Sequence, residues 1–419
     1  MAFLFIYLVL LYIAPQLWVE PFVGFRPDLY LYAAWFGWVI LSGRAVELVR
    51  FRPQDVFFAG WVAWILISIA VNGFTPNSAT IVSDYVKWFL LYRLTVVTLP
   101  TFGHVRRAVL LLLLFGLVLA VEGIQHMHSS TGLGWAGQGF GWVGEEAREA
   151  GYEGRTRWIN IFDGPGVFCV VYTIALPFAM QYLAKPFSVG IRMTGLLMVA
   201  PLLVATYYTG SRGGILATIG IMGLYVLART RVSLGKLVFV AGLLVVTLAI
   251  APSYFTSTAD SSRSAQHRIE MWAEGVEMVR YNPVFGIGKG NFLSYTSKLI
   301  AHNSAIEIMG ETGAPGLFLW LGIIYMGYKT LLAGYRKSED LRVQSYIVAI
   351  GLSIAGYLLS SMFVTLEYET FYFLLAISAA VGNTLQVSPR FAWRDLWLLG
   401  GTMMSFFIAV KLVAILYPS

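Results

Sequence analysis

Three polar stretches, far apart in the chain, contain residue types suited to phosphate and sugar chemistry. They are "TGSRGG" with Arg212, "HRIEMWAEGVEMVRYNPVFGIGKGNF" with Arg268, and "HNSAIEIMGETGAPGLFLW" with His302. An arginine grips phosphate oxygens with a planar fork and stays charged at any working pH. Arginines around a diphosphate would stabilise the charge that it gains as its bond to a sugar breaks, without a metal ion. His302 could accept the proton of the attacking sugar hydroxyl near neutrality.

Arg212 follows Ser211 at the point where one predicted span ends and the next begins. The start of a helix favours anions, and glycines at 210, 213 and 214 would let a neighbouring backbone approach closely. Arg212 could instead reach from the helix to lipid headgroups, as arginines at a membrane boundary do.

Arg268 lies in a stretch whose periodicity predicts a helix from about 264 to 280. Trp272 follows it at helical spacing, which puts the arginine on the apolar face of that helix. An arginine needed only for solubility would lie on the opposite face. The alternative is an ion pair with Glu270 or Glu274.

The sequence "YNPVFGIGKGNF" ends this helix with Asn-Pro and supplies glycines at 286, 288 and 290. Such a loop can point backbone N–H groups toward an anion. The pattern is not Gly-x-Gly-x-x-Gly after a strand, so it does not indicate a dinucleotide site.

His302 is followed by polar residues at helical spacing. Asn303, Glu307 and Glu311 lie at i, i+4 and i+8, which predicts one shared helix face, and Pro315 should kink the segment. His302 could instead be an interfacial histidine bonded to backbone. Glu307 and Glu311 could bond loop backbone or cap neighbouring helices, and no catalytic role is assigned to them.

Other polar sites carry less chemistry. The stretch "GRTRWINIFDGPG" places Arg157 just before a span, where it could help to hold an anion or anchor the chain beside Trp158. Glu367 and Glu369 have no neighbouring His or third carboxylate in the sequence, so they do not form a metal-binding pattern. His-Glu-x-x-His, Walker A and Gly-x-Ser-x-Gly motifs are all missing from the sequence.

The elements that must position these residues are membrane helices. The 419 residues are 58% hydrophobic and 12% charged, whereas a soluble domain carries about a quarter charged residues. The N-terminal apolar run lacks a basic region and a cleavage site, so we interpret it as a first span. The single Cys169 excludes a disulfide within the chain. Apolar stretches predict thirteen spans, at about 2–19, 28–43, 54–72, 80–99, 106–124, 163–184, 192–208, 213–228, 235–251, 311–334, 343–362, 366–384 and 393–416.

Basic residues fall in alternate connections and predict which side of the membrane each connection occupies. The six clusters are Arg44/Arg50/Arg52, Arg93/Arg106/Arg107, Lys185/Arg192, Arg229/Arg231/Lys236, Arg336/Lys337/Arg342 and Arg390/Arg394. This topological bias accounts for the net charge of +7, and nucleic acid is not an expected partner.

The positive-inside rule then places all three chemical stretches at the outer face. We expect an all-α, polytopic transmembrane bundle of about 12–13 spans with a partly helical outer loop. It would consist of N-terminal transmembrane helices over 1–251, including an outer loop at 125–160, a large outer loop at 252–301, and C-terminal transmembrane helices over 302–419.

At the three stretches the sequence resembles the O-antigen ligase / O-antigen polymerase superfamily of bacterial inner-membrane proteins. The motifs occur in the same order over about 210–320: small-Ser-Arg-Gly, then Arg…Trp…Asn-Pro…Gly-x-Gly-x-Gly-Asn-Phe, then His-Asn…Glu-x-Gly…Gly. The sequence departs from the superfamily in a thirteenth apolar segment after 390 and in a Glu/Gly-rich loop at 125–160.

The resemblance implies a GT-C-like glycosyltransferase that uses neither a metal nor another cofactor and acts at the periplasmic face. Its donor would be a glycan on undecaprenyl diphosphate that arrives laterally from the membrane lipids, and its acceptor the lipid A core or another glycan that arrives from outside. Arg212 and Arg268 would grip the diphosphate, and His302 would activate the acceptor hydroxyl. The other predicted substrate-binding residues are Arg157, Ser211, Lys289 and Asn303.

Moderate size and a single large loop favour a ligase within this superfamily. An O-antigen or exopolysaccharide polymerase and an exosortase-associated O-glycosylation ligase are alternatives. A transporter or flippase for lipid-linked sugars would also gather arginines around a diphosphate. Transporters tend to place charges near the bilayer midplane between repeated halves, whereas this sequence shows no internal repeat and predicts its charges at one face.

Overall fold

The computed structural model describes residues 1–24, 27–139, 154–229, 258–296 and 300–416. Regular structure within these ranges is helical, apart from one isolated bridge between Trp158 and Asp163. The prediction of an all-α polytopic bundle is confirmed. Each predicted span corresponds to a helix or a run of short helices, except the span at 235–251, which lies outside the described residues.

Eight of the described helices are long and apolar enough to cross a membrane. They are Pro53–Asn72, Phe102–Met127, Pro165–Leu183, Val189–Tyr208, Arg212–Arg229, Ser304–Lys337, Leu341–Ser361 and Trp393–Leu412. A shorter apolar helix covers Ala2–Ile13.

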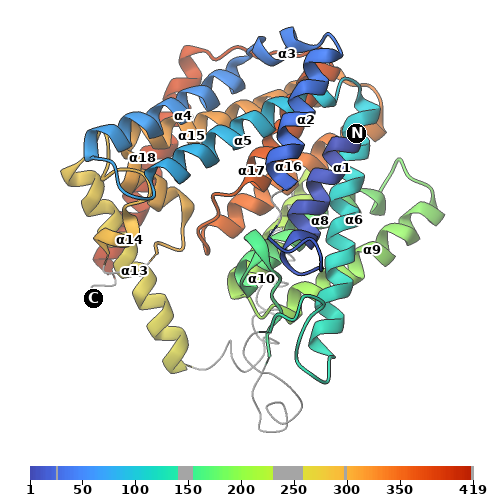
Figure 1. Ribbon diagram of the computed structural model, residues 1–419, viewed down its shortest axis with the longest axis horizontal. Helices are drawn as coiled ribbons and strands as arrows, with labels where there is room; N and C mark the ends of the chain where they lie inside the picture. The colour runs from blue at the N-terminus through green and yellow to red at the C-terminus, as the bar shows by residue number, and fades with distance from the viewer. Residues whose placement is uncertain (25–26, 140–153, 230–257, 297–299, 417–419) are drawn as a thin grey trace. The chain divides into compact units, whose positions relative to one another are not determined.

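The chain divides into two compact units, each assembled from separate stretches of sequence. The first unit consists of Met1–Arg44, Thr98–Thr256 and Gly334–Phe363. Its helices (Figure 1) are α1 (Ala2–Leu8), η1 (Val9–Ile13), η2 (Pro15–Leu17), α2 (Pro27–Leu41), α6 (Phe102–Met127), η3 (Asn160–Phe162), α8 (Pro165–Met180), η4 (Gln181–Leu183), α9 (Val189–Tyr208), α10 (Arg212–Arg229) and α16 (Leu341–Ser361).

Helix α8 is the core of the first unit, because every residue from Phe168 to Met180 is buried. It packs against α6, α9, α10 and α16. Where α8 meets α6, a Cβ on Gly116 would come within 2.3 Å of Ala175, so only glycine allows this close approach. The Tyr172 hydroxyl donates a 3.0 Å hydrogen bond to the carbonyl of Leu119, which adds a polar tie between the two helices.

The second unit consists of Ala45–Val97, Ser257–Ala333 and Val364–Ser419. Its helices are α3 (Ala45–Val49), α4 (Pro53–Asn72), α5 (Ser78–Thr98), α13 (Thr258–Tyr281), α14 (Phe292–Tyr295), α15 (Ser304–Lys337), α17 (Glu369–Thr384) and α18 (Trp393–Leu416). Helix α17 is buried from Thr370 to Gly382. Side chains of α4 bond to it, with Trp61 Nε1 donating to the Tyr372 hydroxyl at 3.2 Å and Gln54 Nε2 to the Leu375 carbonyl at 3.2 Å.

Arg93 differs from its interpretation as a basic loop residue. It lies within α5, is 4% exposed, and forms an ion pair with Asp55 at 2.8 Å. Its guanidinium also donates to the carbonyls of Glu47, Leu48 and Arg50. Arg93 therefore provides hydrogen-bond donors for the backbone carbonyl groups that precede α4.

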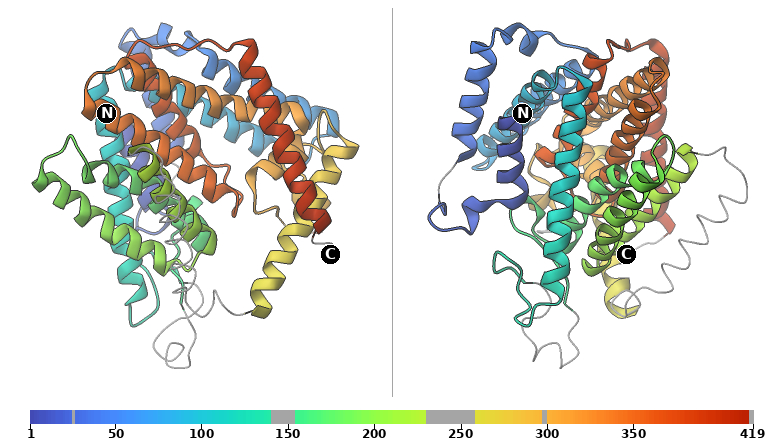
Figure 2. Two further views of the ribbon diagram at one scale, coloured as in Figure 1. Left: turned by 180° about the vertical axis from the view of Figure 1, so that it is seen from behind. Right: turned by 90° about the vertical axis from the view of Figure 1, so that its right-hand side faces the viewer.

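The helix predicted at 264–280 is confirmed as α13, which ends at Tyr281, immediately before Asn-Pro. The last apolar segment, α18, packs against it, and the left view of Figure 2 shows the two helices side by side. Their contact forms part of a small core that contains Val276, Met278, Phe292, Ala301, Ile306 and Val410.

Candidate active site

Helix α13 packs against the segment that carries His302. Trp272 Nε1 donates a 3.0 Å hydrogen bond to the carbonyl of Ala301, the residue before His302. Arg268 lies four residues before Trp272, and side chains at this spacing share one face of a helix. α13 therefore presents the face that carries Arg268 to the His302 segment.

The electrostatics of His302 reflect this arrangement. The residue is half-buried, and its φ of 50° lies in the left-handed region. Burial lowers the pKa of the imidazole below its ordinary value of 6.5, and the positive charge of Arg268 lowers the pKa further. An imidazole with this pKa is neutral at pH 7 and can accept a proton.

Asn303 fixes the start of α15. Its side-chain oxygen accepts hydrogen bonds from the backbone N–H groups of Ala305 (3.1 Å) and Ile306 (3.3 Å), and the residue is 2% exposed. This is the geometry of a helix N-cap. Asn303 thus holds the backbone that positions His302, and its predicted contact with substrate stays a prediction.

Helix α15 is broken near its beginning, as Pro315 predicted. The non-helical residue is Gly313, with φ 70° and ψ −173°. A break of this kind frees carbonyl groups that need other donors. Trp64 Nε1 donates to the carbonyl of Thr312 at 2.8 Å, and Ser68 Oγ lies 3.0 Å from the carbonyl of Glu311.

The glycine loop after α13 closes over this break. The N–H groups of Ile287 and Gly288 donate to the carbonyls of Gly310 (3.1 Å) and Glu311 (2.9 Å). A Cβ on Gly286 would lie 2.3 Å from the backbone of Glu311, so glycine is required there.

The expectation that the loop can point backbone N–H groups toward an anion is confirmed. The N–H groups of Gly290 and Phe292 both donate to Oε1 of Glu311 at 3.0 Å. The anion that this loop binds is a side chain of the protein itself.

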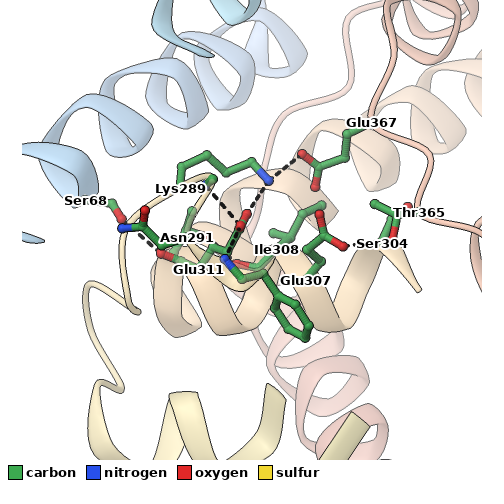
Figure 3. Close-up of polar contacts among 12 residues, drawn as sticks. Ser68, Lys289, Asn291, Ser304, Glu307, Ile308, Glu311, Thr365 and Glu367 are labelled. Carbon is green, nitrogen blue, oxygen red and sulfur yellow. Dashed lines mark hydrogen bonds and ion pairs between the residues drawn. The ribbon is translucent and has the colours of Figure 1, made fainter. Parts of the chain in front are cut away.

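Lys289 completes this arrangement. Its ammonium nitrogen lies 2.5 Å from Oε2 of Glu311 and 2.8 Å from Oε2 of Glu367, as Figure 3 shows. Burial alone would lower the pKa of the ammonium, but the carboxylates of Glu311, Glu367 and Glu307 raise it above its ordinary value. Lys289 is a charged, 7% exposed group that holds two carboxylates. Its predicted role in substrate binding stays a prediction.

A cavity of about 270 Å³ opens beside these groups. All of its lining residues belong to the second unit: Ile81, Asp84, Tyr85, Trp88, Lys289, Gly290, Glu307, Glu311, Thr365, Glu367 and Tyr368. Within the described part of the chain, no group of three or more His, Cys, Asp or Glu side chains is placed to hold a metal ion.

Sequence reasoning missed the cluster of Glu307, Glu311 and Glu367. The first two are four residues apart, and the cavity shows that they do share one face of α15, as predicted. Glu367 looked isolated in the sequence, but in the fold it shares Lys289 with Glu311. Carboxylates on an otherwise apolar helix were the available signal, since such groups need buried partners.

In the first unit, Ser211 and Arg212 begin α10. Ser211 Oγ accepts a 3.1 Å hydrogen bond from the N–H of Gly214, so Ser211 caps the helix and Arg212 is its first residue. A Cβ on Gly214 would lie 2.2 Å from the sulfur of Cys169, so glycine lets the Cys169 side chain pack directly on the backbone of α10.

Arg157 pairs with Asp163 at 3.2 Å and has a one-third exposed side chain. Its neighbour Trp158 is fully buried and donates a 2.6 Å hydrogen bond to the carbonyl of Tyr12. Trp158 therefore packs inside the first unit, and whether Arg157 binds an anion or anchors the chain stays open.

The segment of Arg157 also lies beside the start of α10. The N–H of Thr156 donates to the carbonyl of Tyr208, at the end of α9, at 3.1 Å. The first unit thus brings two predicted substrate-binding stretches to one turn.

The predicted site residues divide between the two units. Arg157, Ser211 and Arg212 belong to the first unit. The second unit contains Arg268, Lys289, His302 and Asn303. A common site for Arg212, Arg268 and His302 stays a prediction.

The eight long apolar helices and their packing define a multi-pass membrane protein. Residues 197–321, from α9 to the first half of α15, match the family model of O-antigen ligase. The match includes all three chemical stretches and supports the assignment of the chain to the O-antigen ligase superfamily, whose members are ligases and polymerases of glycans. No curated protein matches the chain.

Proposed function

We propose that this protein is an O-antigen ligase-type glycosyltransferase. It transfers a glycan from undecaprenyl diphosphate to an acceptor sugar, such as the lipid A core, at the periplasmic face of the bacterial inner membrane. The observation that carries this proposal is the Trp272–Ala301 hydrogen bond, which packs the helix of Arg268 against the half-buried His302 within the segment that matches O-antigen ligase.

The reaction needs positive charge beside the leaving diphosphate and a proton acceptor beside the attacking hydroxyl. The acceptor hydroxyl oxygen attacks the anomeric carbon of the donor, and the bond from that carbon to the diphosphate oxygen breaks. The electron pair stays on the diphosphate, where Arg212 and Arg268 stabilise it with bidentate hydrogen bonds. His302 takes the proton of the acceptor hydroxyl. In this scheme Asn303 and Ser211 position the two helix starts that carry the reacting groups.

The test is transfer by the purified protein from a defined polyprenyl-diphosphate glycan. Lipid A core and unloaded donor are offered as competing acceptors, with a chelator present. We expect glycan on lipid A core. The chelator should not prevent the transfer, because the arginines supply the positive charge that a metal would otherwise provide. A product extended on the donor identifies a polymerase, and strict dependence on an added divalent ion contradicts the metal-free mechanism.

Matched variants test the role of the guanidinium. Arg268→Ala should lower the transfer rate by roughly 100-fold or more, and Arg268→Lys by nearly as much, because a point charge does not replace a bidentate fork. Arg280→Ala is the control, since Arg280 lies on the same helix but is exposed and pairs with Glu277. Normal transfer by Arg268→Ala would remove this residue from the mechanism. Donor moved across vesicle membranes without any transfer would indicate a flippase.

A further inference from the structure

We propose that the cavity beside Lys289 is the subsite of the acceptor sugar, and that it selects a neutral or amino-substituted ring over an acidic one. Its assignment to the acceptor rests on the proposed function, whereas the binding of a sugar there does not.

The charge of the cavity argues against an anionic ligand. Its wall contains the carboxylates of Asp84, Glu307, Glu311 and Glu367, against the single ammonium of Lys289. Lys289 is already shared by Glu311 and Glu367, and Asp84 pairs with Lys87 at 2.9 Å. A phosphate or a uronic acid would meet acidic side chains and a lysine that is already paired twice, so this is not the place for the donor diphosphate.

A metal ion also fits poorly. Figure 3 shows the Lys289 ammonium between Glu311 and Glu367, in the position that a cation would need. The N–H groups of Gly290 and Phe292 occupy the other oxygen of Glu311. An oxygen ligand that already accepts two backbone hydrogen bonds has little to offer a hard cation.

Aromatic side chains also line the cavity. Tyr85, Trp88 and Tyr368 line it, and Trp88 is fixed by a 3.1 Å hydrogen bond from Nε1 to Glu369. The face of an aromatic ring is electron-rich, so it attracts the polarised C–H groups on one side of a pyranose. Aromatic rings together with hydrogen-bond acceptors are what a sugar ring requires, with its apolar faces and its rim of hydroxyls.

The cavity also contains hydrogen-bond acceptors for the hydroxyl groups of a sugar. Oε1 of Glu367 is buried and has no hydrogen-bond partner among the residues that the structure describes, while its Oε2 is bonded by Tyr85 and Lys289. Glu307 is held on one oxygen by Thr365 at 2.8 Å. The volume of about 270 Å³ is close to the lower limit of about 300 Å³ for pockets that take drug-sized ligands, which suits one or two sugar rings.

The cavity lies close to the predicted base. Glu307 is in the first turn of α15, and His302 lies two residues before that helix begins. With a rise of about 1.5 Å per residue, Glu307 is only about 5 Å further along the axis than the helix start. A ring bound against Glu307 would lie at the same end of α15 as His302.

The first experiment measures binding without catalysis. Saturation-transfer NMR on the purified full chain is recorded with three methyl glycosides, namely a neutral hexose, a 2-amino-2-deoxyhexose and a hexuronic acid. The first two should receive saturation, and the hexuronic acid should not. Equal saturation of the hexuronic acid, or none for any glycoside, overturns the inference.

Variants then locate the binding. Trp88→Leu should weaken binding of the neutral hexose by about tenfold, and Trp88→Phe should restore most of it, because an aromatic face contributes up to about a factor of ten. Phe89→Leu is the matched control, since Phe89 packs against Phe58 on another face of α5. Unchanged binding by a folded Trp88→Leu places the sugar elsewhere and overturns the inference.

Charge selection has its own variant. Glu307→Gln keeps an acceptor for Thr365 but removes an acidic group that could ionise beside an amino sugar, so it should admit the hexuronic acid and weaken binding of the amino sugar by several-fold. Glu277→Gln, on the exposed side of α13, should change neither. Transfer is assayed on the same preparations. A raised KM for the acceptor in Trp88→Leu, with an unchanged KM for the donor, supports the acceptor assignment. If the wild type binds glycosides as expected but transfers nothing, the proposed function fails and the sugar subsite stands.

Discussion

The protonation state of His302 sets the pH range in which it can act as a base. Burial and the charge of Arg268 both lower the pKa of the imidazole below 6.5. The neutral form is the proton acceptor, so transfer should be constant around pH 7 and fall on the acid side with an apparent pKa below 6.5. The measurement is kcat/KM against pH.

Variants of Arg268 and His302 should change the pH profile in different ways. In Arg268→Gln the positive charge is gone, so the pKa of His302 should rise. The residual activity should then begin to fall at a higher pH than in the wild type. His302→Gln should lower the rate by roughly 100- to 10,000-fold and abolish the acid limb. An unshifted limb in Arg268→Gln would mean that the arginine does not act on His302.

Lys289 tests whether a cation in the glycine loop serves the fold or the substrate. The structure gives it two carboxylate partners, so Lys289→Met should destabilise the protein by about 3–5 kcal/mol, the cost of leaving buried charges uncompensated. Burial raises the pKa of Glu367, and Lys289 opposes this shift. Without Lys289 the pKa of Glu367 in the folded state rises further. The stability of the variant is then greatest below about pH 4.5, the ordinary value, and falls as the pH rises.

Thermal unfolding in detergent from pH 5 to 8 measures this effect. Lys87→Met is the control, because Lys87 and Asp84 form a partly exposed pair that contributes at most about 1 kcal/mol. A stable Lys289→Met protein with a raised donor KM would instead support the substrate-binding role predicted from the sequence.

The helices themselves were largely predictable, because apolar runs of membrane length leave the backbone few alternatives to helix. Asn-Pro fixed the end of α13, and Pro315 indicated the break in α15. The partner of the glycine loop was not predictable. Glycines at 286 and 288 indicate close backbone approach, but whether a substrate or Glu311 approaches depends on how α13 and α15 pack. That packing joins residues more than twenty positions apart.

Gly313 tests the importance of the break in α15. Its φ is 70°, and a Cβ there would lie 2.2 Å from the carbonyl oxygen of Val284. Gly313→Ala should therefore cost at least about 1–3 kcal/mol of stability and lower transfer activity, because the loop that carries Lys289 must move. Gly400→Ala in α18, which meets nothing within 4 Å, should stay within about 0.5 kcal/mol of the wild type. Heat resistance in detergent, followed by size-exclusion chromatography, compares the two. Equal resistance would show that the break tolerates a side chain.

The division of the chain into two units had no signal in the sequence. Hydropathy predicts spans one at a time, whereas each unit combines stretches that are far apart, such as Ala45–Val97 with Ser257–Ala333. The basic clusters predict the side of the membrane only when they are taken together, because a single arginine can have another role. Arg93 shows why, since it serves a buried ion pair with Asp55 rather than a loop. The sidedness of the protein therefore needs a direct experiment.

Thiol labelling provides this experiment, because the native Cys169 is buried and should not react with a membrane-impermeant maleimide. Ser130 and Ser42 are both exposed and lie on connections that the positive-inside rule assigns to opposite sides. Ser130→Cys should be labelled in intact spheroplasts, and Ser42→Cys only after lysis. The unmodified protein is the control for reaction at Cys169. Labelling of Ser42→Cys from outside would put the turn of Arg212 and the segment of His302 on the cytoplasmic side. A periplasmic transfer from undecaprenyl diphosphate would then be excluded.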